Sequence, residues 1–238
     1  MHTSDRRLHE EARINMKISE FFQPQQTRCL RCGGAYFDSL ELGLCPACAL
    51  HVHSAPEGDL RAVLKHGRDV LDWASAAFMY SDGVRERVHA LKYGGARKLG
   101  EQMGREMHLA LQVMPIMPDA LLPVPLHWSR RWARGYNQAE TLARGLAGQC
   151  GLPIETKLLT RARRTRSNAS LDHSDRMSNV QGAFVLRGDV RGRRILLIDD
   201  VLTTGSTVSQ CAGALRAGGA AWVGVLTYAR AGSVYGDG

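Results

Sequence analysis

From residue 73 onward, short apolar runs alternate with segments whose apolar residues recur at helical spacing. The apolar runs predict strands over 74–80, 119–128 (ending in a proline-punctuated loop), 154–161, 183–188, 193–200 and 220–230. The helical spacing predicts helices over 83–95, 97–113, 135–151 and 206–219. Because the strand segments are apolar throughout instead of alternating, they are typical of a parallel sheet buried on both faces. The pattern therefore predicts an α/β fold in which helices flank a parallel sheet.

Two segments of this pattern carry more specific expectations. Along 97–113, an apolar stripe predicts the core-facing side of one continuous helix, and its members are Leu99, Met103, Met107 and Leu111. Segment 162–182 is polar, basic and without apolar periodicity. Structureless segments of this length in a compact domain are usually functional or disordered.

Four of the six cysteines are clustered, and they are Cys29, Cys32, Cys45 and Cys48. They form two C-x2-C pairs separated by twelve residues, which is the spacing of a zinc ribbon. Redox-active pairs and disulfides are the alternatives, and neither suits a chain of the cytoplasm. Four thiolates leave no open coordination position, so the predicted role of Zn²⁺ is structural.

The cysteine cluster divides the chain into predicted parts. These are an N-terminal tail (1–25), a zinc-ribbon module (26–54), a linker (55–72), the α/β domain (73–232) and a C-terminal tail (233–238). No apolar run approaches the roughly 20 residues of a membrane helix, and the charged N-terminus lacks the apolar centre of a signal peptide. We therefore expect a cytoplasmic protein without membrane insertion.

The positive charge of the chain is concentrated in one region. The net charge is +8, and residues 128–166 contain nine Lys or Arg against two acidic residues, Glu140 and Glu155. Such a local excess indicates a polyanionic ligand, either a phosphate-rich small molecule or nucleic acid.

The strongest candidate chemistry lies in "ILLIDDVLTTGST" (195–207), where an apolar strand ends in Asp199 and Asp200. The residues that follow form a predicted phosphate cradle at a helix start, and they are Thr203, Thr204, Gly205, Ser206 and Thr207. The carboxylates accept hydrogen bonds or bind cations, so they suit ribose hydroxyls or Mg²⁺ shared with a pyrophosphate. Together these features predict a ribose 5-phosphate site at the carboxyl end of the sheet.

Other interpretations of this stretch are weaker or remain open. A Walker-type site requires Gly-Lys, which occurs nowhere in the chain. A flavin-binding loop follows the first strand, whereas this loop precedes the last helix. A strand end and a capped helix without any ligand is the remaining alternative.

A second class of function is suggested by aromatic residues between arginines. Trp128, Trp132 and Tyr136 alternate with Arg130, Arg131 and Arg134. Stacking platforms beside cations suit single-stranded DNA. Packing of the aromatic rings on the core, with the arginines solvated or bound to pyrophosphate, is the alternative.

The 195–207 stretch resembles the phosphoribosyl pyrophosphate (PRPP) motif of type I phosphoribosyltransferases. The cysteine pairs, "HALKYGG", "PVPLHWSRRWARGYNQAETLA", "RTRSNASLDHSDRMSNVQGAF" and this motif, in that order, resemble the competence protein F (ComF) family. The resemblance implies a type I phosphoribosyltransferase-like sheet preceded by a zinc ribbon.

The resemblance also implies roles for individual residues. Asp199, Asp200 and Arg176 would be catalytic, with Arg176 in a mobile loop and the two aspartates binding the PRPP ribose and, indirectly, Mg²⁺. The cradle would hold the 5-phosphate, and Val124, Pro125 and Leu126 would form the pyrophosphate loop. Candidate contacts to DNA or pyrophosphate are Arg130, Arg131, Trp132, Arg134, Asn137 and Gln138.

The implied function is PRPP–Mg²⁺ binding in the service of DNA uptake in natural transformation, or of nucleotide-linked metabolism. The expected partners are PRPP, single-stranded DNA and DNA-uptake proteins. The resemblance favours a phosphoribosyltransferase, a glycosyltransferase of the pentosyl type, whose acceptor the sequence does not identify. A single-stranded DNA-binding accessory protein that performs no transfer is the alternative.

Overall fold

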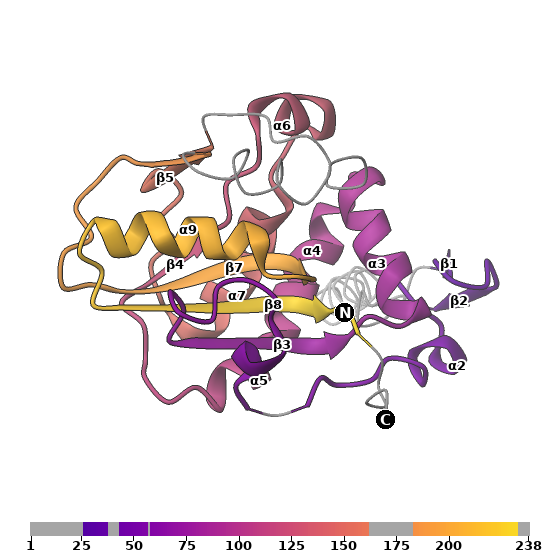
Figure 1. The fold of residues 1–238 in the computed structure, drawn as a ribbon. Helices are drawn as coiled ribbons and strands as arrows, with labels where there is room; N and C mark the ends of the chain where they lie inside the picture. Colours follow the sequence, from indigo (N-terminus) through magenta and orange to yellow (C-terminus); the bar gives the residue numbers. More distant parts are fainter. Residues whose placement is uncertain (1–25, 38–42, 57, 162–182, 233–238) are drawn as a thin grey trace, which may run out of the picture.

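The computed structural model describes residues 26–37, 43–56, 58–161 and 183–232. Its centre is a four-stranded parallel sheet in the order β3-β8-β7-β4 (Figure 1). The strands are β3 (Trp73–Met79), β4 (Ala120–Pro123), β7 (Arg194–Leu202) and β8 (Trp222–Arg230). Along β7, Ile195 and Leu197 join the core on one face while Leu196 and Ile198 join the core on the other. The parallel sheet predicted from unbroken apolar runs is therefore confirmed.

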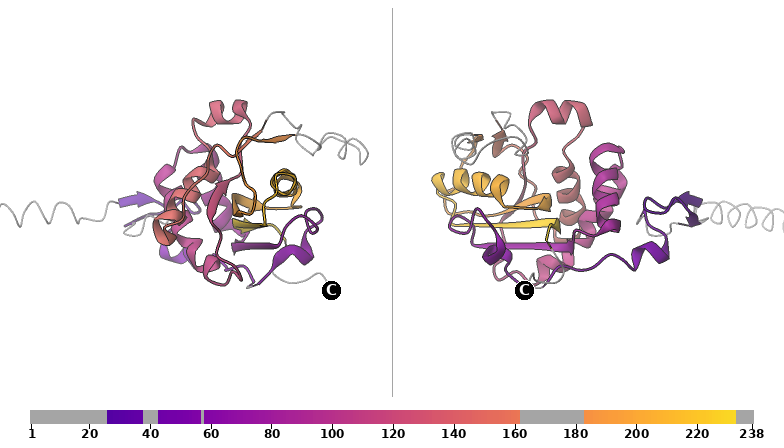
Figure 2. Two further views of the ribbon diagram at one scale, coloured as in Figure 1. Left: turned by 90° about the vertical axis from the view of Figure 1, so that its left-hand side faces the viewer. Right: turned by 45° about the vertical axis from the view of Figure 1, so that its right-hand side comes forward.

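Helices cover both faces of this sheet (Figures 1 and 2). One face packs against α9 (Ser206–Ala217) and the short 3-10 helix η1 (Leu60–Val63). The other face packs against α3 (Asp82–Tyr93), α4 (Arg97–Glu106), α5 (His108–Gln112) and α7 (Gln138–Cys150). The backbones of α4 and α7 meet at Gly104 and Gly145, where any Cβ would lie within about 2 Å of a carbonyl oxygen of the other helix. Glycine is required at this crossing because the backbones are in direct contact.

The segment predicted as one helix, 97–113, forms two helices that meet at Met107. Met107 has φ −65° and ψ −15°, which is close to 3-10 geometry, so the helix tightens there. Its side chain is fully buried, as are those of Met103 and Leu111. The expected core stripe is therefore confirmed although the helix is interrupted.

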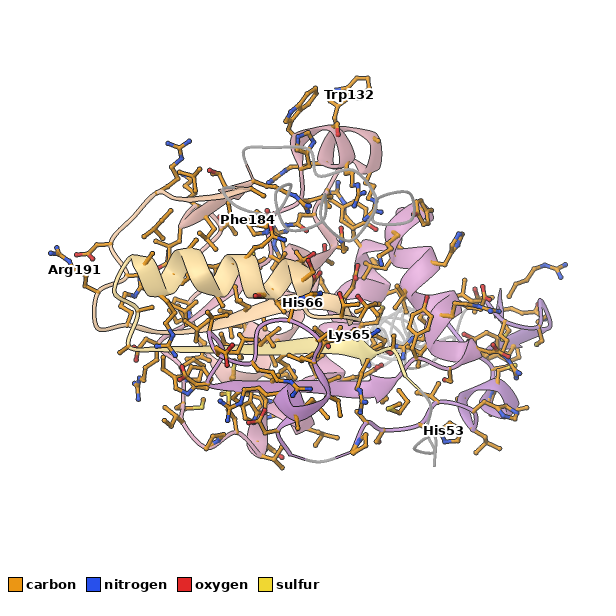
Figure 3. The ribbon with its side chains drawn as sticks, viewed as in Figure 1. His53, Lys65, His66, Trp132, Phe184 and Arg191 are labelled. Carbon is orange, nitrogen blue, oxygen red and sulfur yellow. The ribbon has the colours of Figure 1, made fainter. Side chains whose placement is uncertain are left out.

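Two of the predicted strands do not join the parallel sheet. β5 (Leu159–Arg161) and β6 (Phe184–Leu186) pair antiparallel with each other, with Leu159 opposite Leu186. Leu159 and Phe184 are buried, whereas the other residues of both strands are half-buried. The pair lies above the α9 face, where Phe184 marks its position (Figure 3).

The segment expected to be a loop after β4 contains a helix, α6 (Trp128–Arg134). His127 begins it, because its ring Nδ1 accepts a hydrogen bond from the Ser129 N–H at 3.3 Å. Gly135 ends it in the left-handed conformation, with φ +74°. No residue of α6 is buried, which explains why apolar periodicity could not reveal this helix.

The cysteine module consists of β1 (Gln26–Arg28), β2 (Ala35–Phe37) and α2 (Pro46–Ala49), and it lies beside α3 (Figure 2). The domain boundaries remain a prediction, and within the predicted linker Leu60, Leu64 and Leu71 are buried in the core. Among the described residues, no helix has the length and apolar character needed to cross a bilayer. The predicted tails (1–25 and 233–238) and the basic segment 162–182 lie outside the described residues.

Candidate functional site

The turn between β7 and α9 forms a small cavity at the carboxyl end of the sheet. Gly205 has φ +83°, and a Cβ there would lie 2.4 Å from the His66 carbonyl oxygen. The His66 N–H donates to the Thr204 carbonyl at 3.0 Å, so the backbone of His66 contacts the turn at two adjacent residues. Figure 3 labels His66 near the start of α9. The cavity measures about 90 Å³ and is lined by residues 199 and 201–208. This space, at the N-terminus of a twelve-residue helix, suits one phosphate group.

Asp199 lines this cradle, whereas the side chain of Asp200, the next residue on β7, pairs with α3. The Asp200 Oδ1 atom is 3.0 Å from the Lys92 Nζ atom at the end of α3. The Asp200 Oδ2 atom is buried and has no hydrogen-bond partner within the described part of the chain. A buried acceptor without a donor is costly, so this atom suits a ligand hydroxyl or a cation-bound water.

The Asp199 carboxylate is half-buried, and its Oδ1 accepts the Asp200 N–H at 2.9 Å. Burial, and then the neighbouring Asp200 charge, raise the pKa of Asp199 to about 7. Lys92 and Arg161 oppose this increase. Asp199 therefore binds its proton more tightly than an exposed aspartate does, and a bound cation would lower this pKa. The two carboxylates are oxygen ligands of the kind that Mg²⁺ prefers, so the donor set fits this ion.

The predicted pyrophosphate loop follows β4 at the same edge of the sheet. The Val124 N–H donates to the Ile198 carbonyl at 2.9 Å, which extends the β4–β7 pairing into the loop. The buried Asn137 side chain donates through Nδ2 to the Val124 carbonyl and accepts from the Ala139 N–H, both at 3.1 Å. Asn137 therefore both caps α7 and holds this loop, a role that the sequence alone did not explain.

The remaining residues predicted to contact DNA or pyrophosphate lie on α6 and at the start of α7. Arg131 pairs with Glu140 at 3.0 Å, and Arg134 donates to the Gln138 Oε1 atom at 3.1 Å. Arg130 is exposed. Trp132 is 87% exposed at the outer end of the molecule (Figure 3). The structure thus places Arg131 and Arg134 in contact with side chains of α7, while the Trp132 ring points outward (Figure 3).

Tyr136 differs from the two tryptophans with which the sequence grouped it. Its hydroxyl donates to the Leu91 carbonyl, and the Arg97 guanidinium lies 5.0 Å from the centre of its ring. Trp128, by contrast, is 71% exposed. Tyr136, just before α7, packs against α3, so of these three aromatic residues the two tryptophans are the exposed ones.

The structure adds residues to the site that sequence analysis did not assign. A cavity of about 580 Å³ lies between the end of α3 and α6, and it is lined by Lys92, Tyr93, Gly95, Arg130, Ala133 and Arg134. Lys92 and Tyr93 belong to the "HALKYGG" stretch. This stretch contributed only to the family resemblance, and its residues were given no role from the sequence. Arg176 lies outside the described residues, so its catalytic assignment stays a prediction.

The four clustered cysteines converge as their spacing predicts. The sulfur atoms of Cys29, Cys32, Cys45 and Cys48 all lie within 4.8 Å of one another. All six cysteines of the chain fall within the described residues and are free thiols. Arg31 points its Nη1 atom at the Cys48 sulfur at 3.9 Å and forms an ion pair with Asp82 of α3 at 3.6 Å. The cluster can hold one metal ion with four sulfur ligands, and it is attached to the start of α3.

Comparison with known proteins identifies relatives over most of the chain. Residues 133–237 match the Phosphoribosyl transferase domain family. The chain is 28% identical over 223 residues to Competence protein F of Haemophilus influenzae, which covers 86% of this chain and 97% of that protein. It is 36% identical over 157 residues to DNA utilization protein YhgH of Salmonella typhi, which covers 63% of this chain and 69% of that protein. It is also 28% identical over 185 residues to Competence protein ComFC of Streptococcus pneumoniae, which covers 74% and 76% of the two chains.

Proposed function

Since the chain belongs to the competence protein F (ComF) family, we propose that it binds PRPP with Mg²⁺ and transfers the phosphoribosyl group in a process that serves DNA uptake or nucleotide-linked metabolism. The names of the relatives, Competence protein F and DNA utilization protein, support the link to DNA uptake. The observation that carries the proposal is the pairing of a one-phosphate cradle with a buried carboxylate oxygen that has no donor among the described residues.

Each group at the carboxyl end of the parallel sheet has a role in this proposal. The backbone N–H groups at the start of α9 hold the 5-phosphate, and Asp199 and Asp200 accept hydrogen bonds from the ribose hydroxyls. The loop at Val124, Pro125 and Leu126 holds the pyrophosphate. Asp199 and Asp200 would hold Mg²⁺, which would supply positive charge against the pyrophosphate. Fixing the phosphate and ribose in this way orients C1 of the ribose toward an acceptor.

A titration with PRPP and Mg²⁺ tests this assignment. We expect calorimetry to detect binding to the wild-type protein and to detect none with Asp199→Asn/Asp200→Asn. Asp189→Asn is the matched control, because Asp189 is an exposed acid that pairs with Arg191. Undiminished binding by the double variant would exclude the proposed site.

We propose Zn²⁺ as the metal of the cysteine cluster, in a structural role, because four thiolates form the closed shell typical of structural zinc. Metal analysis after anaerobic purification should find about one zinc per chain, and Cys29→Ser/Cys48→Ser should abolish it. Cys150→Ser is the control, since Cys150 lies on α7 outside the cluster. A wild-type protein without zinc would refute the assignment.

Single-stranded DNA binding is the second candidate function, and the exposed rings of Trp128 and Trp132 favour it. The two residues are four apart on α6, so their rings lie on one side of the helix and can stack with successive bases. We expect the affinity for single strands to fall steeply with salt and to weaken about tenfold or more in Trp128→Ala/Trp132→Ala. Affinity that is independent of salt would count against this candidate.

A further inference from the structure

A second cavity of the described residues lies between α3 and α6, and we call it the α3–α6 pocket. Its volume of about 580 Å³ lies within the range of roughly 300–1,000 Å³ that is usual for small-molecule sites. The cradle at α9 measures about 90 Å³ and has room for a phosphate group alone. The α3–α6 pocket therefore has room for a ligand several times larger than one phosphate.

The charge in this pocket is positive and is only partly neutralised. Lys92, Arg130 and Arg134 line it, and only Lys92 has a carboxylate partner within the described part of the chain. Arg131 lies on the same helix but outside this lining, and it is neutralised by Glu140. Guanidinium groups without carboxylate partners suit a phosphate, which they bind with two parallel hydrogen bonds.

One wall of the pocket is flat and aromatic. The Tyr93 ring is 66% exposed at the end of α3. The Arg134 guanidinium lies 5.1 Å from the centre of this ring, and the centre of the tilted His89 ring lies 4.8 Å from it, so a delocalised cation and two aromatic rings adjoin one another. Such a surface suits the flat ring of a nucleobase, because these groups stack on aromatic faces. Inorganic pyrophosphate would make no use of it.

The pocket adjoins the proposed PRPP site through one side chain. Lys92 lines the pocket, and its Nζ atom is 3.0 Å from the Asp200 Oδ1 atom. A ligand in the α3–α6 pocket would therefore lie beside the groups proposed to hold the ribose.

We propose that the α3–α6 pocket binds a nucleoside 5′-monophosphate unit, with its phosphate on Arg130 and Arg134 and its base against Tyr93. The unit is either a free nucleotide or the 5′-phosphorylated end of a DNA strand. That this unit would lie beside bound PRPP rests on the proposed function. Binding of the unit in the α3–α6 pocket does not depend on that function.

The test compares thymidine 5′-monophosphate with thymidine, both by calorimetry on the full chain without PRPP. We expect the monophosphate to bind and thymidine to bind at least about tenfold more weakly, because only the former reaches the arginines. Tyr93→Leu/Arg134→Ala should weaken monophosphate binding about tenfold or more. Arg191→Ala is the matched control, since it removes one exposed guanidinium at the opposite end of the molecule (Figure 3). Tyr93→Leu alone provides a variant that leaves the hydrogen bonds of α6 intact.

The same variants are titrated with PRPP and Mg²⁺. This titration distinguishes failure of the α3–α6 pocket proposal from failure of the proposed PRPP binding. Loss of monophosphate binding with PRPP affinity retained within about twofold supports the α3–α6 pocket. Equal loss of both ligands would assign the pocket to pyrophosphate and overturn the inference. Failure of the wild-type protein to bind the monophosphate, or unchanged binding by the double variant, would also overturn it. A wild-type protein that binds the monophosphate but no PRPP would refute the proposed function alone.

A short oligothymidylate that carries either a 5′-phosphate or a 5′-hydroxyl distinguishes the two sources of the monophosphate unit, a free nucleotide and a strand end. Tighter binding of the phosphorylated strand, abolished in Tyr93→Leu/Arg134→Ala, assigns the pocket to strand ends. Equal binding of the two strands, together with phosphate-dependent binding of the free nucleotide, assigns it to free nucleotides.

Discussion

The two candidate sites at the carboxyl edge of the sheet are built from different parts of the chain. The cradle at α9 is a contiguous turn of backbone, fixed by Gly205 and by the His66 segment that packs on it. The α3–α6 pocket is lined mainly by side chains at the end of α3 and on α6, and these are Lys92, Tyr93, Arg130 and Arg134. Changes at the cradle should therefore affect folding together with binding, whereas changes at the pocket should affect binding alone.

The largest effect is expected from Gly205→Ala. The new Cβ would meet the His66 carbonyl at 2.4 Å at a positive φ, so the turn must move. We expect the free energy of unfolding to fall by about 4 kcal/mol or more and PRPP binding to be lost. Gly148→Ala on α7 is the control, since nothing lies within 4 Å of a Cβ there, and we expect it to be neutral or stabilising. Chemical denaturation checks both variants, and a stable Gly205→Ala protein would contradict the rigid cradle.

This contrast also explains what could be predicted from the sequence. The Asp199–Thr207 site was predictable because its carboxylates, glycine and helix start are contiguous, and unbroken apolar strands revealed the sheet. The α3–α6 pocket was not predictable, because Tyr93 and Arg134 meet only when α3 and α6 are folded onto the same edge. The helix α6 itself escaped prediction because no residue in it is buried.

Asp199→Asn should produce the next largest effect, and the effect should depend on pH. The pKa of Asp199 is raised to about 7 from 3.8, so the folded protein holds this proton more tightly than the unfolded chain does. The stabilisation from that proton is complete below about pH 4 and is lost as the pH rises through 7. We therefore expect Asp199→Asn to be more stable than the wild type at pH 8, by at most about 4 kcal/mol because solvent screens this half-buried group, and nearly equal to it at pH 4. Thermal unfolding across this range measures the difference, and a difference independent of pH would contradict the assigned pKa.

Asn137→Ala should have a smaller effect on stability, and it should also weaken PRPP binding. The substitution removes the cap of α7 and leaves the Val124 carbonyl without its donor. We expect a loss of about 2 kcal/mol and weaker PRPP binding, because the loop is no longer held. Asn137→Ser, which can still cap the helix, should recover part of the stability but not the hydrogen bond to the loop. Denaturation and calorimetry on both variants distinguish the two contributions.

Arg134→Ala should have the smallest effect on stability. It therefore tests whether a change in the α3–α6 pocket affects binding without affecting folding. Arg134 is half-buried, and in the described part of the chain its hydrogen bond is to the neutral Gln138. We expect a change of less than about 0.5 kcal/mol in the free energy of unfolding, with a clear loss of thymidine 5′-monophosphate binding. A destabilisation as large as that of Asn137→Ala would show that α6 depends on this contact for folding.

A crystal structure of the protein with PRPP and Mg²⁺ shows whether the α9 cradle holds the 5-phosphate of PRPP. We expect the 5-phosphate to lie within hydrogen-bond distance of the backbone N–H groups of residues 205–207. We also expect a ribose hydroxyl against the Asp200 Oδ2 atom. PRPP with its 5-phosphate in the α3–α6 pocket, or with no contact to either aspartate, would contradict the proposed site.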